Sequence, residues 1–156
     1  MHHAIDRTNK RAEQKELFQK HLKEIDGITP LLNRLNHRMA IASGSDIDRL
    51  EFTLKLTNLW DRFSPHVYSS TLVTNGKPAP DIFLYAANEL NTQPSNCWVI
   101  EDSENGVRAG KAAGMKVIGF VGGSHITHKD EHALKLQKLG ADYIIHHIQD
   151  AFKILN

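Results

Sequence analysis

From Gly27 to its end, the chain alternates short apolar runs with stretches of helical periodicity. The apolar runs predict five strands, at residues 39–43, 67–70, 97–101, 116–120 and 142–146. Apolar residues that recur every three or four positions predict helices at residues 46–59, 80–90, 104–113, 131–139 and 148–155. Strands that alternate with helices and are apolar on both faces are typical of a parallel sheet covered on both sides. We therefore expect an α/β fold with a doubly wound parallel sheet.

Length and charge restrict the classes of function. A chain of 156 residues forms one domain of ordinary size and can bury roughly 70% of its unfolded surface. Its 19 Lys and Arg residues nearly balance 18 Asp and Glu residues, which argues against nucleic acid or a membrane surface as the partner. No apolar run approaches the roughly 20 residues that span a bilayer. The single cysteine, Cys97, cannot form an internal disulfide, so we expect a reducing, cytoplasmic location.

The first 25 residues differ from the rest because they are mostly polar. Leu17, Phe18, Leu22 and Ile25 recur at helical spacing and form one narrow apolar stripe. Residues 5–25 are therefore expected to form a helix, which either packs on a partner elsewhere or frays at its ends.

Candidates for chemistry are the residues that follow the predicted strands, because a doubly wound sheet binds its ligands beyond the carboxyl ends of its strands. Ser43, Gly44, Ser45 and Asp46 follow the first strand. A hydroxyl followed by free backbone N–H groups at the start of a helix suits a bound anion such as phosphate. The alternative is an ordinary helix cap made by Ser45 or Asp46. Taken alone, this segment favours the cap.

Two adjacent carboxylates, Glu101 and Asp102, stand where the third predicted strand ends, and Ser103 follows them. Magnesium prefers oxygen ligands and is often held by one or two carboxylates together with phosphate oxygens. The alternative is that one of the acids only caps the next helix. Because a strongly apolar strand leads straight into the paired acids, we favour the metal-binding interpretation.

A lysine, Lys77, lies in the proline-rich segment 74–81, just ahead of a predicted helix. Pro78 and Pro80 stiffen this segment and restrict where the lysine can point. A lysine held in this way suits a phosphoryl group, whereas most lysines are solvated surface residues. The segment is not a nucleotide-binding P-loop, because that motif needs a glycine where this chain has Thr71 and a Ser or Thr where it has Pro78.

Together the three segments resemble the haloacid dehalogenase superfamily of aspartate-nucleophile phosphatases. Ser43 resembles the second motif of that family, Lys77 in GKPAPDIF the third, and Glu101 with Asp102 in VIEDSENGVRAG the fourth. The resemblance covers about residues 25–155 and is strongest to the helical-capped branch of β-phosphoglucomutase-like enzymes and sugar-phosphate phosphatases. It implies a Rossmann-like core and a small phosphorylated metabolite as substrate, with sugar phosphates favoured.

The resemblance also implies the chemistry of the site. In this family an aspartate attacks the phosphoryl group, and water then hydrolyses the phospho-aspartate. Ser43, Gly44 and Ser45 would bind the phosphoryl oxygens, and Lys77 would bridge the phosphate and the nucleophilic carboxylate. The paired acids Glu101 and Asp102 would hold Mg²⁺. The hydroxyl of Ser103 would support them from behind.

One departure from the family is large. Its first motif, Asp-x-Asp-x-Thr on an N-terminal strand, does not occur in this chain, and neither the segment 6–8 nor the segment 26–29 replaces it. We interpret the chain as N-terminally truncated, with residues 1–25 as the remnant of a helical cap and linker and residues 26–156 as the core. Without the nucleophile, the chain alone is expected to lack phosphatase activity.

In the resembled fold the missing strand is central, between the strand that ends at Ser43 and the strand that ends at Glu101. Three repairs of the sheet are conceivable: the flanking strands close up, residues 4–25 fill the slot, or a second molecule donates an element in a homo-oligomer. Because residues 7–15 are too polar for a buried strand, we favour closure or oligomerisation.

Two other functions compete with an active phosphatase. The first is a catalytically inactive remnant or partner subunit that binds a ligand or another chain. The second is a receiver-type signalling domain, which we discount because its acidic pair precedes its lysine, whereas here Lys77 precedes Glu101. His125, His128 and His132 have metal-ligand spacing, but solvated histidines are the favoured interpretation.

Overall fold

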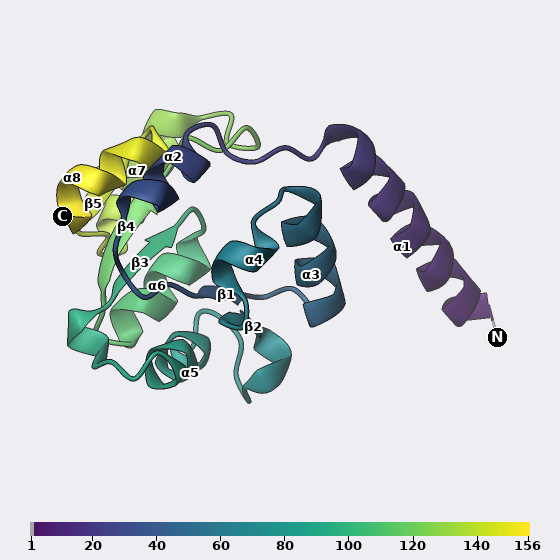
Figure 1. The fold of residues 1–156 in the computed structure, drawn as a ribbon, viewed down its shortest axis with the longest axis horizontal. Helices are drawn as coiled ribbons and strands as arrows, with labels where there is room; N and C mark the ends of the chain where they lie inside the picture. The colour runs from purple at the N-terminus through teal and green to yellow at the C-terminus, as the bar shows by residue number, and fades with distance from the viewer. Residues whose placement is uncertain (1) are drawn as a thin grey trace.

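The computed structural model describes residues 2–156, with side-chain environments described for residues 12–156. It has an α/β body from which one N-terminal helix extends (Figure 1). The strands are β1 (Ile41–Ser43), β2 (Val67–Ser69), β3 (Trp98–Glu101), β4 (Lys116–Phe120) and β5 (Tyr143–Ile145). The α-helices are α1 (His2–His21), α2 (Ile28–Arg34), α3 (Ile47–Leu56), α4 (Trp60–Phe63), α5 (Asp81–Glu89), α6 (Glu104–Ala112), α7 (Lys129–Lys138) and α8 (Ala151–Leu155). Short 3-10 helices lie at η1 (Ser70–Leu72), η2 (Pro94–Asn96) and η3 (Ile148–Asp150).

Every predicted strand is present, and all except β4 are one or two residues shorter than predicted. The predicted helix 46–59 is present as α3 but ends at Leu56, and the short helix α4 that follows it was not predicted. Asn58 lies between them with a φ of 58°, a left-handed conformation that ends helices. Helix α2 was not predicted, since it has only seven residues and too few periodic positions to stand out from the sequence.

All strand pairs are parallel, but they form two sheets instead of one. β1 pairs with β2, placing Ile41 opposite Val67. The other sheet has the order β3-β4-β5, with Val99 opposite Val117. Within residues 2–156, no pairing joins β1 to β3. The expected parallel α/β fold is confirmed, and the sheet is interrupted where the missing strand of the resembled fold would lie.

The main core covers both faces of the three-stranded sheet. Val117 faces one apolar cluster that includes side chains of α5, α6 and α7, and Ile118 faces a second that includes side chains of α2 and α8. Both side chains have no exposed surface. Helix α6 approaches the sheet closely at Gly110, where an added Cβ would lie 2.8 Å from Val117 Cγ2. These helices hold the carboxyl end of β3 in a fixed position.

Closure of the gap by direct pairing of β1 and β3, one of the two favoured repairs, is wrong for the described chain. Side chains of α2 on one face and of α5 on the other lie between the two half-sheets, so closure would require these helices to move together. Filling of the slot by residues 4–25 does not occur either, because α1 is a helix that extends away from the body (Figure 1). Completion of the sheet by a second molecule stays a prediction.

Helix α1 contacts the body through charged and aromatic side chains of α3. Lys15 Nζ lies 5.4 Å from the ring centre of Phe52, and the Arg49 guanidinium lies 5.2 Å from that of Phe18. Leu17 remains 57% exposed. None of the helices in the described part of the chain is long and apolar enough to cross a membrane.

Candidate functional site

The loop after β1 is held by hydroxyl groups from the carboxyl ends of both strands of the two-stranded sheet. Ser43 Oγ accepts a hydrogen bond from the Ser45 amide at 3.2 Å. Two serines contact the loop from the neighbouring strand end. Ser69, the last residue of β2, donates from Oγ to the Ser45 carbonyl at 2.7 Å, and Ser70, the first residue of η1, donates from Oγ to the Gly44 carbonyl at 3.0 Å. The backbone of this loop is therefore held in position. Sequence analysis missed Ser69 and Ser70, although polar residues at the end of a strand were the available signal.

The helix-cap interpretation of this segment is confirmed for one residue. Asp46 is the N-cap of α3, and its Oδ1 accepts a hydrogen bond from the Arg49 amide at 2.9 Å. The cap leaves Ser43 and Gly44 outside the helix, and a Cβ added at Gly44 would meet nothing within 4 Å. Both features coexist: Asp46 begins the helix, and the preceding turn stays open to a ligand.

Lys77 is a partly buried ion-pair partner rather than a solvated surface lysine. Its Nζ donates to the Ala42 carbonyl at 3.1 Å and to Glu101 Oε1. The side chains of Lys77 and Glu101 are only 15% and 10% exposed. The ammonium also lies 4.7 Å from the ring centre of Phe83. The solvated-lysine interpretation is therefore wrong, and Lys77 joins the ends of β1 and β3.

The carboxylate of Glu101 is fixed by a second set of contacts. Its Oε2 accepts a hydrogen bond from Ser103 Oγ at 3.0 Å, and Ser103 Oγ accepts one from the Gly106 amide, also at 3.0 Å. Ser103, and neither acid, is thus the N-cap of α6. A Cβ added at Gly106 would lie 1.9 Å from Glu101 Cδ, so the carboxylate occupies space that only glycine leaves free.

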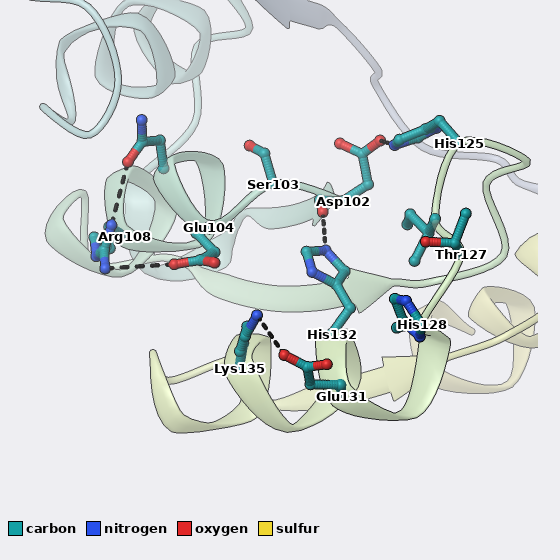
Figure 2. A pocket seen from close by; sticks show the side chains of 12 residues that line it. Asp102, Ser103, Glu104, Arg108, His125, Thr127, His128, Glu131, His132 and Lys135 are labelled. Carbon is teal, nitrogen blue, oxygen red and sulfur yellow. Dashed lines mark hydrogen bonds and ion pairs between the residues drawn. The ribbon is translucent and has the colours of Figure 1, made fainter.

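Asp102 lines a cavity, shown in Figure 2, of which Glu101 is not a lining residue. Its Oδ2 lies 3.1 Å from His125 Nε2, and its backbone carbonyl accepts a hydrogen bond from His132 Nε2 at 2.6 Å. The cavity has a volume of about 660 Å³. The solvated-histidine interpretation is confirmed for His125, whose side chain is 67% exposed despite its contact with Asp102, whereas His132 is half-buried.

The other charged side chains of this cavity neutralise one another. Glu104 pairs with Arg108 at 3.6 Å, and Glu131 pairs with Lys135 at 2.8 Å (Figure 2). The hydrogen bond between Glu131 and Lys135 holds the pKa of Glu131 below its ordinary value and the pKa of Lys135 above its ordinary value. Among the described residues, no group of three His, Cys, Asp or Glu side chains is placed to hold a metal ion.

The structure thus brings together part of the predicted site. The Lys77 ammonium contacts both Glu101 and the residue that precedes Ser43. The Asp102 side chain lies apart, because the loop after β4 brings His125 to it. Glu101 and Asp102 supply the hard oxygen donors that Mg²⁺ prefers, and one oxygen of Asp102 is paired with His125 in this structure. This arrangement suits binding of an anion beside a fixed cation.

The family of the chain follows from its sequence. A model of the haloacid dehalogenase-like hydrolases matches residues 2–114. The chain therefore belongs to the haloacid dehalogenase-like hydrolase family.

Individual relatives agree with this assignment. The chain is 35% identical over 127 residues to the β-phosphoglucomutase of Bacillus subtilis, covering 81% of this chain and 50% of that protein. It is 38% identical over 115 residues to a probable pseudouridine-5'-phosphatase of Drosophila melanogaster, covering 71% of this chain and 49% of that protein. The chain thus spans about half the length of these curated relatives.

A solved structure extends the comparison to nearly the whole chain. A conserved haloacid dehalogenase-like protein of unknown function from Agrobacterium tumefaciens superposes with a TM-score of 0.87 at 35% identity. The match covers 99% of this chain and 69% of that protein. The similarity therefore includes both half-sheets.

Proposed function

We propose that this chain forms the phosphate- and magnesium-binding side of a phosphatase or phosphomutase that acts on a small phosphorylated metabolite through an aspartyl-phosphate. The observation that supports this most is the partly buried ion pair of Lys77 and Glu101, in which the Lys77 ammonium also contacts the Ala42 carbonyl near the end of β1. A cation held at this position can neutralise phosphoryl oxygens without having to be ordered when the ligand binds.

Each side chain has a distinct role in this proposal. Ser43 and the amides of Gly44 and Ser45 bind phosphoryl oxygens, supported by the fixed loop and the N-terminus of α3. Lys77 bridges the phosphate and a nucleophilic carboxylate. Glu101 and Asp102 hold Mg²⁺, which supplies charge neutralisation at the transferring group. Ser103 orients Glu101 through its hydroxyl.

The names of the relatives support a sugar-like substrate. They include a β-phosphoglucomutase, a probable pseudouridine-5'-phosphatase and a 6-phosphogluconate phosphatase. All three names describe a phosphate carried on a polyhydroxylated carbon skeleton, so we propose a sugar phosphate or a related metabolite. A cytoplasmic location stays a prediction based on the single cysteine, Cys97.

The covalent step is not supplied by the residues of this chain as it stands, because Asp-x-Asp-x-Thr does not occur in it. The chain alone is therefore proposed to bind phosphate without turning over phosphate esters. The interrupted sheet is the observation that supports the alternative, an inactive subunit that binds another chain.

The proposal is tested by measuring the affinity of the chain for inorganic phosphate with calorimetry, in the presence and in the absence of Mg²⁺. The Lys77→Met variant should bind phosphate about tenfold more weakly, since hydrogen bonds to charged groups contribute about 1.5–3 kcal/mol. Lys153→Met, which removes a lysine that is 81% exposed, should bind phosphate as the native chain does. Equal phosphate affinity in Lys77→Met and the native chain would contradict the proposal.

Turnover is tested separately with p-nitrophenyl phosphate and a panel of sugar phosphates in the presence of Mg²⁺. We expect no turnover by the 156-residue chain. Turnover that disappears in Asp102→Asn would show that another carboxylate replaces the nucleophile.

A further inference from the structure

The turn after β3 leads through Asp102 and Ser103 into α6, and the peptide group between these two residues is held at both ends. The carbonyl of Asp102 accepts a hydrogen bond from His132 Nε2 at 2.6 Å. The amide of Ser103, which belongs to the same peptide group, donates to Glu101 Oε2 at 3.4 Å. Rotation of this peptide group would break both contacts, so they fix its orientation.

The direction of the Asp102 carboxylate depends on that peptide group. Because an aspartate side chain is short and occupies staggered rotamers, the backbone largely decides where its oxygens can lie. The side chain of Asp102 is 42% exposed, so packing does not hold it in place. Its contact with His125 is exposed as well, and water competes with such an ion pair. The backbone contact is therefore the stronger constraint on Asp102.

His132 belongs to a helix that is itself seated on the sheet. It lies in the first turn of α7, where its amide donates to the His128 carbonyl at 2.9 Å. One turn further along α7, the side chain of Leu136 has no exposed surface. A Cβ added at Gly119 of β4 would lie 3.1 Å from Leu136 Cδ1, so α7 packs directly on the strand. The contact from His132 thus ties the turn that carries Asp102 to a fixed helix.

His128 lines the same cavity but is not equivalent to His132. It is the N-cap of α7 and makes no side-chain hydrogen bond in that position. Within residues 12–156, no hydrogen bond or ion pair joins His128 to Asp102, as Figure 2 shows. The two histidines therefore differ in the one contact that concerns the turn after β3.

We infer that His132 is a positioning residue of the proposed magnesium site: by holding the Asp102 carbonyl, it fixes the direction in which Asp102 presents its carboxylate. A carbonyl oxygen only accepts hydrogen bonds, so Nε2 of His132 carries the hydrogen. Asp102 Oδ1 has no hydrogen bond or ion pair with the described residues and is available as a donor to a metal ion. The inference rests on the proposed function, because it concerns the same magnesium site.

Calorimetric titration of the full chain with MgCl₂ tests the inference. His132→Phe keeps a ring of similar size but loses the donor, and should bind Mg²⁺ about tenfold more weakly or worse, since groups that orient a metal ligand change the affinity by about 10–100-fold. His132→Gln can donate from its amide nitrogen and should recover most of the affinity. The matched control, His128→Phe, should bind Mg²⁺ as the native chain does.

A further variant separates positioning from general stability. Leu136→Val removes buried apolar volume from α7 but does not line the cavity, so it should lower the melting temperature and leave the Mg²⁺ affinity unchanged. A merely structural His132 would behave in the same way. A His132→Phe variant with native Mg²⁺ affinity, or a His132→Gln variant that binds no better than His132→Phe, would overturn the inference.

Asp102→Asn distinguishes failure of the inference from failure of the proposed function. This variant loses a charged oxygen donor and should bind Mg²⁺ more weakly than the native chain. If the native chain binds no Mg²⁺, or if Asp102→Asn binds it equally well, the proposed magnesium site is wrong and the inference falls with it. If Asp102→Asn weakens binding and His132→Phe does not, only the role of His132 is wrong.

Discussion

The two half-sheets are built from similar apolar strands but differ in burial. In the three-stranded sheet β4 has a strand on each side, and its Val117 and Ile118 have no exposed surface. In the two-stranded sheet β1 has a neighbour on one side, and all three of its residues are only half-buried. Helices flank both. The number of strand neighbours does not explain this, because β2 also has only one and all three of its residues are buried. What distinguishes β1 is that Ile41 and Ala42 line the cavity between the two half-sheets.

Truncation of one isoleucine in each sheet should give the largest contrast. Ile118→Ala removes a fully buried side chain and should lower the free energy of unfolding by about 2–5 kcal/mol. Ile41→Ala, on half-buried β1, should cost about 1 kcal/mol because less apolar surface leaves water. Urea denaturation of both variants measures this. Equal losses would mean that β1 is as well packed as β4.

The edge of β3 can be disturbed through a glycine. Gly106→Ala places a Cβ on the Glu101 carboxylate and should cost about 1–3 kcal/mol through overpacking. Gly44→Ala is the matched control: its Cβ meets nothing within 4 Å, so its effect should stay within about 0.5 kcal/mol. Thermal unfolding followed by circular dichroism compares the two variants. A Gly106→Ala variant as stable as the native chain would show that the carboxylate moves freely.

Lys77 is the side chain that joins the two half-sheets. Lys77→Met should lower the free energy of unfolding by about 1–2 kcal/mol, because Glu101 loses its charged partner but keeps Ser103. Lys153→Met removes an exposed ion pair with Asp150 and should cost less than about 0.5 kcal/mol. Urea denaturation at constant pH measures both. A loss in Lys153→Met as large as in Lys77→Met would end the claim that Lys77 links the sheets.

The smallest effect is expected inside the three-stranded sheet and depends on pH. Asp142 Oδ2 accepts hydrogen bonds from the Val117 amide at 2.7 Å and from Lys111 Nζ at 2.9 Å. Burial raises the pKa of Asp142, but these hydrogen bonds outweigh it and hold the pKa below 3.8. The stabilisation is therefore complete above 3.8 and is lost as the pH falls through the pKa of the folded state.

Asp142→Asn should accordingly cost about 1 kcal/mol at neutral pH, the usual contribution of a hydrogen bond. The difference in free energy of unfolding between native and variant should shrink as the pH falls below about 4. Urea denaturation across that pH range measures it. A difference that does not vary with pH would indicate that the charge of Asp142 contributes nothing.

Much of the fold could be predicted because short apolar runs mark buried strands regardless of tertiary detail. The end of α3 at Leu56 could not be predicted, since it depends on Asn58 in a conformation that sequence periodicity does not reveal. The interruption of the sheet followed from the missing motif. The sequence did not predict that this gap stays open, because the open gap depends on α2 and α5 packing against its two faces.

In the candidate site, the contact between Lys77 and Glu101 was within reach of sequence analysis, since both follow from the carboxyl ends of parallel strands. The contact of Asp102 with His125 could not be predicted, because His125 comes from a loop whose path has no sequence signature. The roles of Ser69 and Ser70 depend on which strand lies beside β1, and this is known only once the strands are paired.

The double contact of Ser103 gives the molecule a built-in reporter. The Ser103 hydroxyl donates a hydrogen bond to Glu101 and accepts one from the Gly106 amide in the first turn of α6. An ion or phosphate that binds the Glu101 carboxylate therefore changes the hydrogen bond at the start of the helix. The Gly106 amide therefore senses the charge state of the site, although it touches no ligand itself. Its chemical shift would register an ion or phosphate arriving at Glu101, without any label and without turnover.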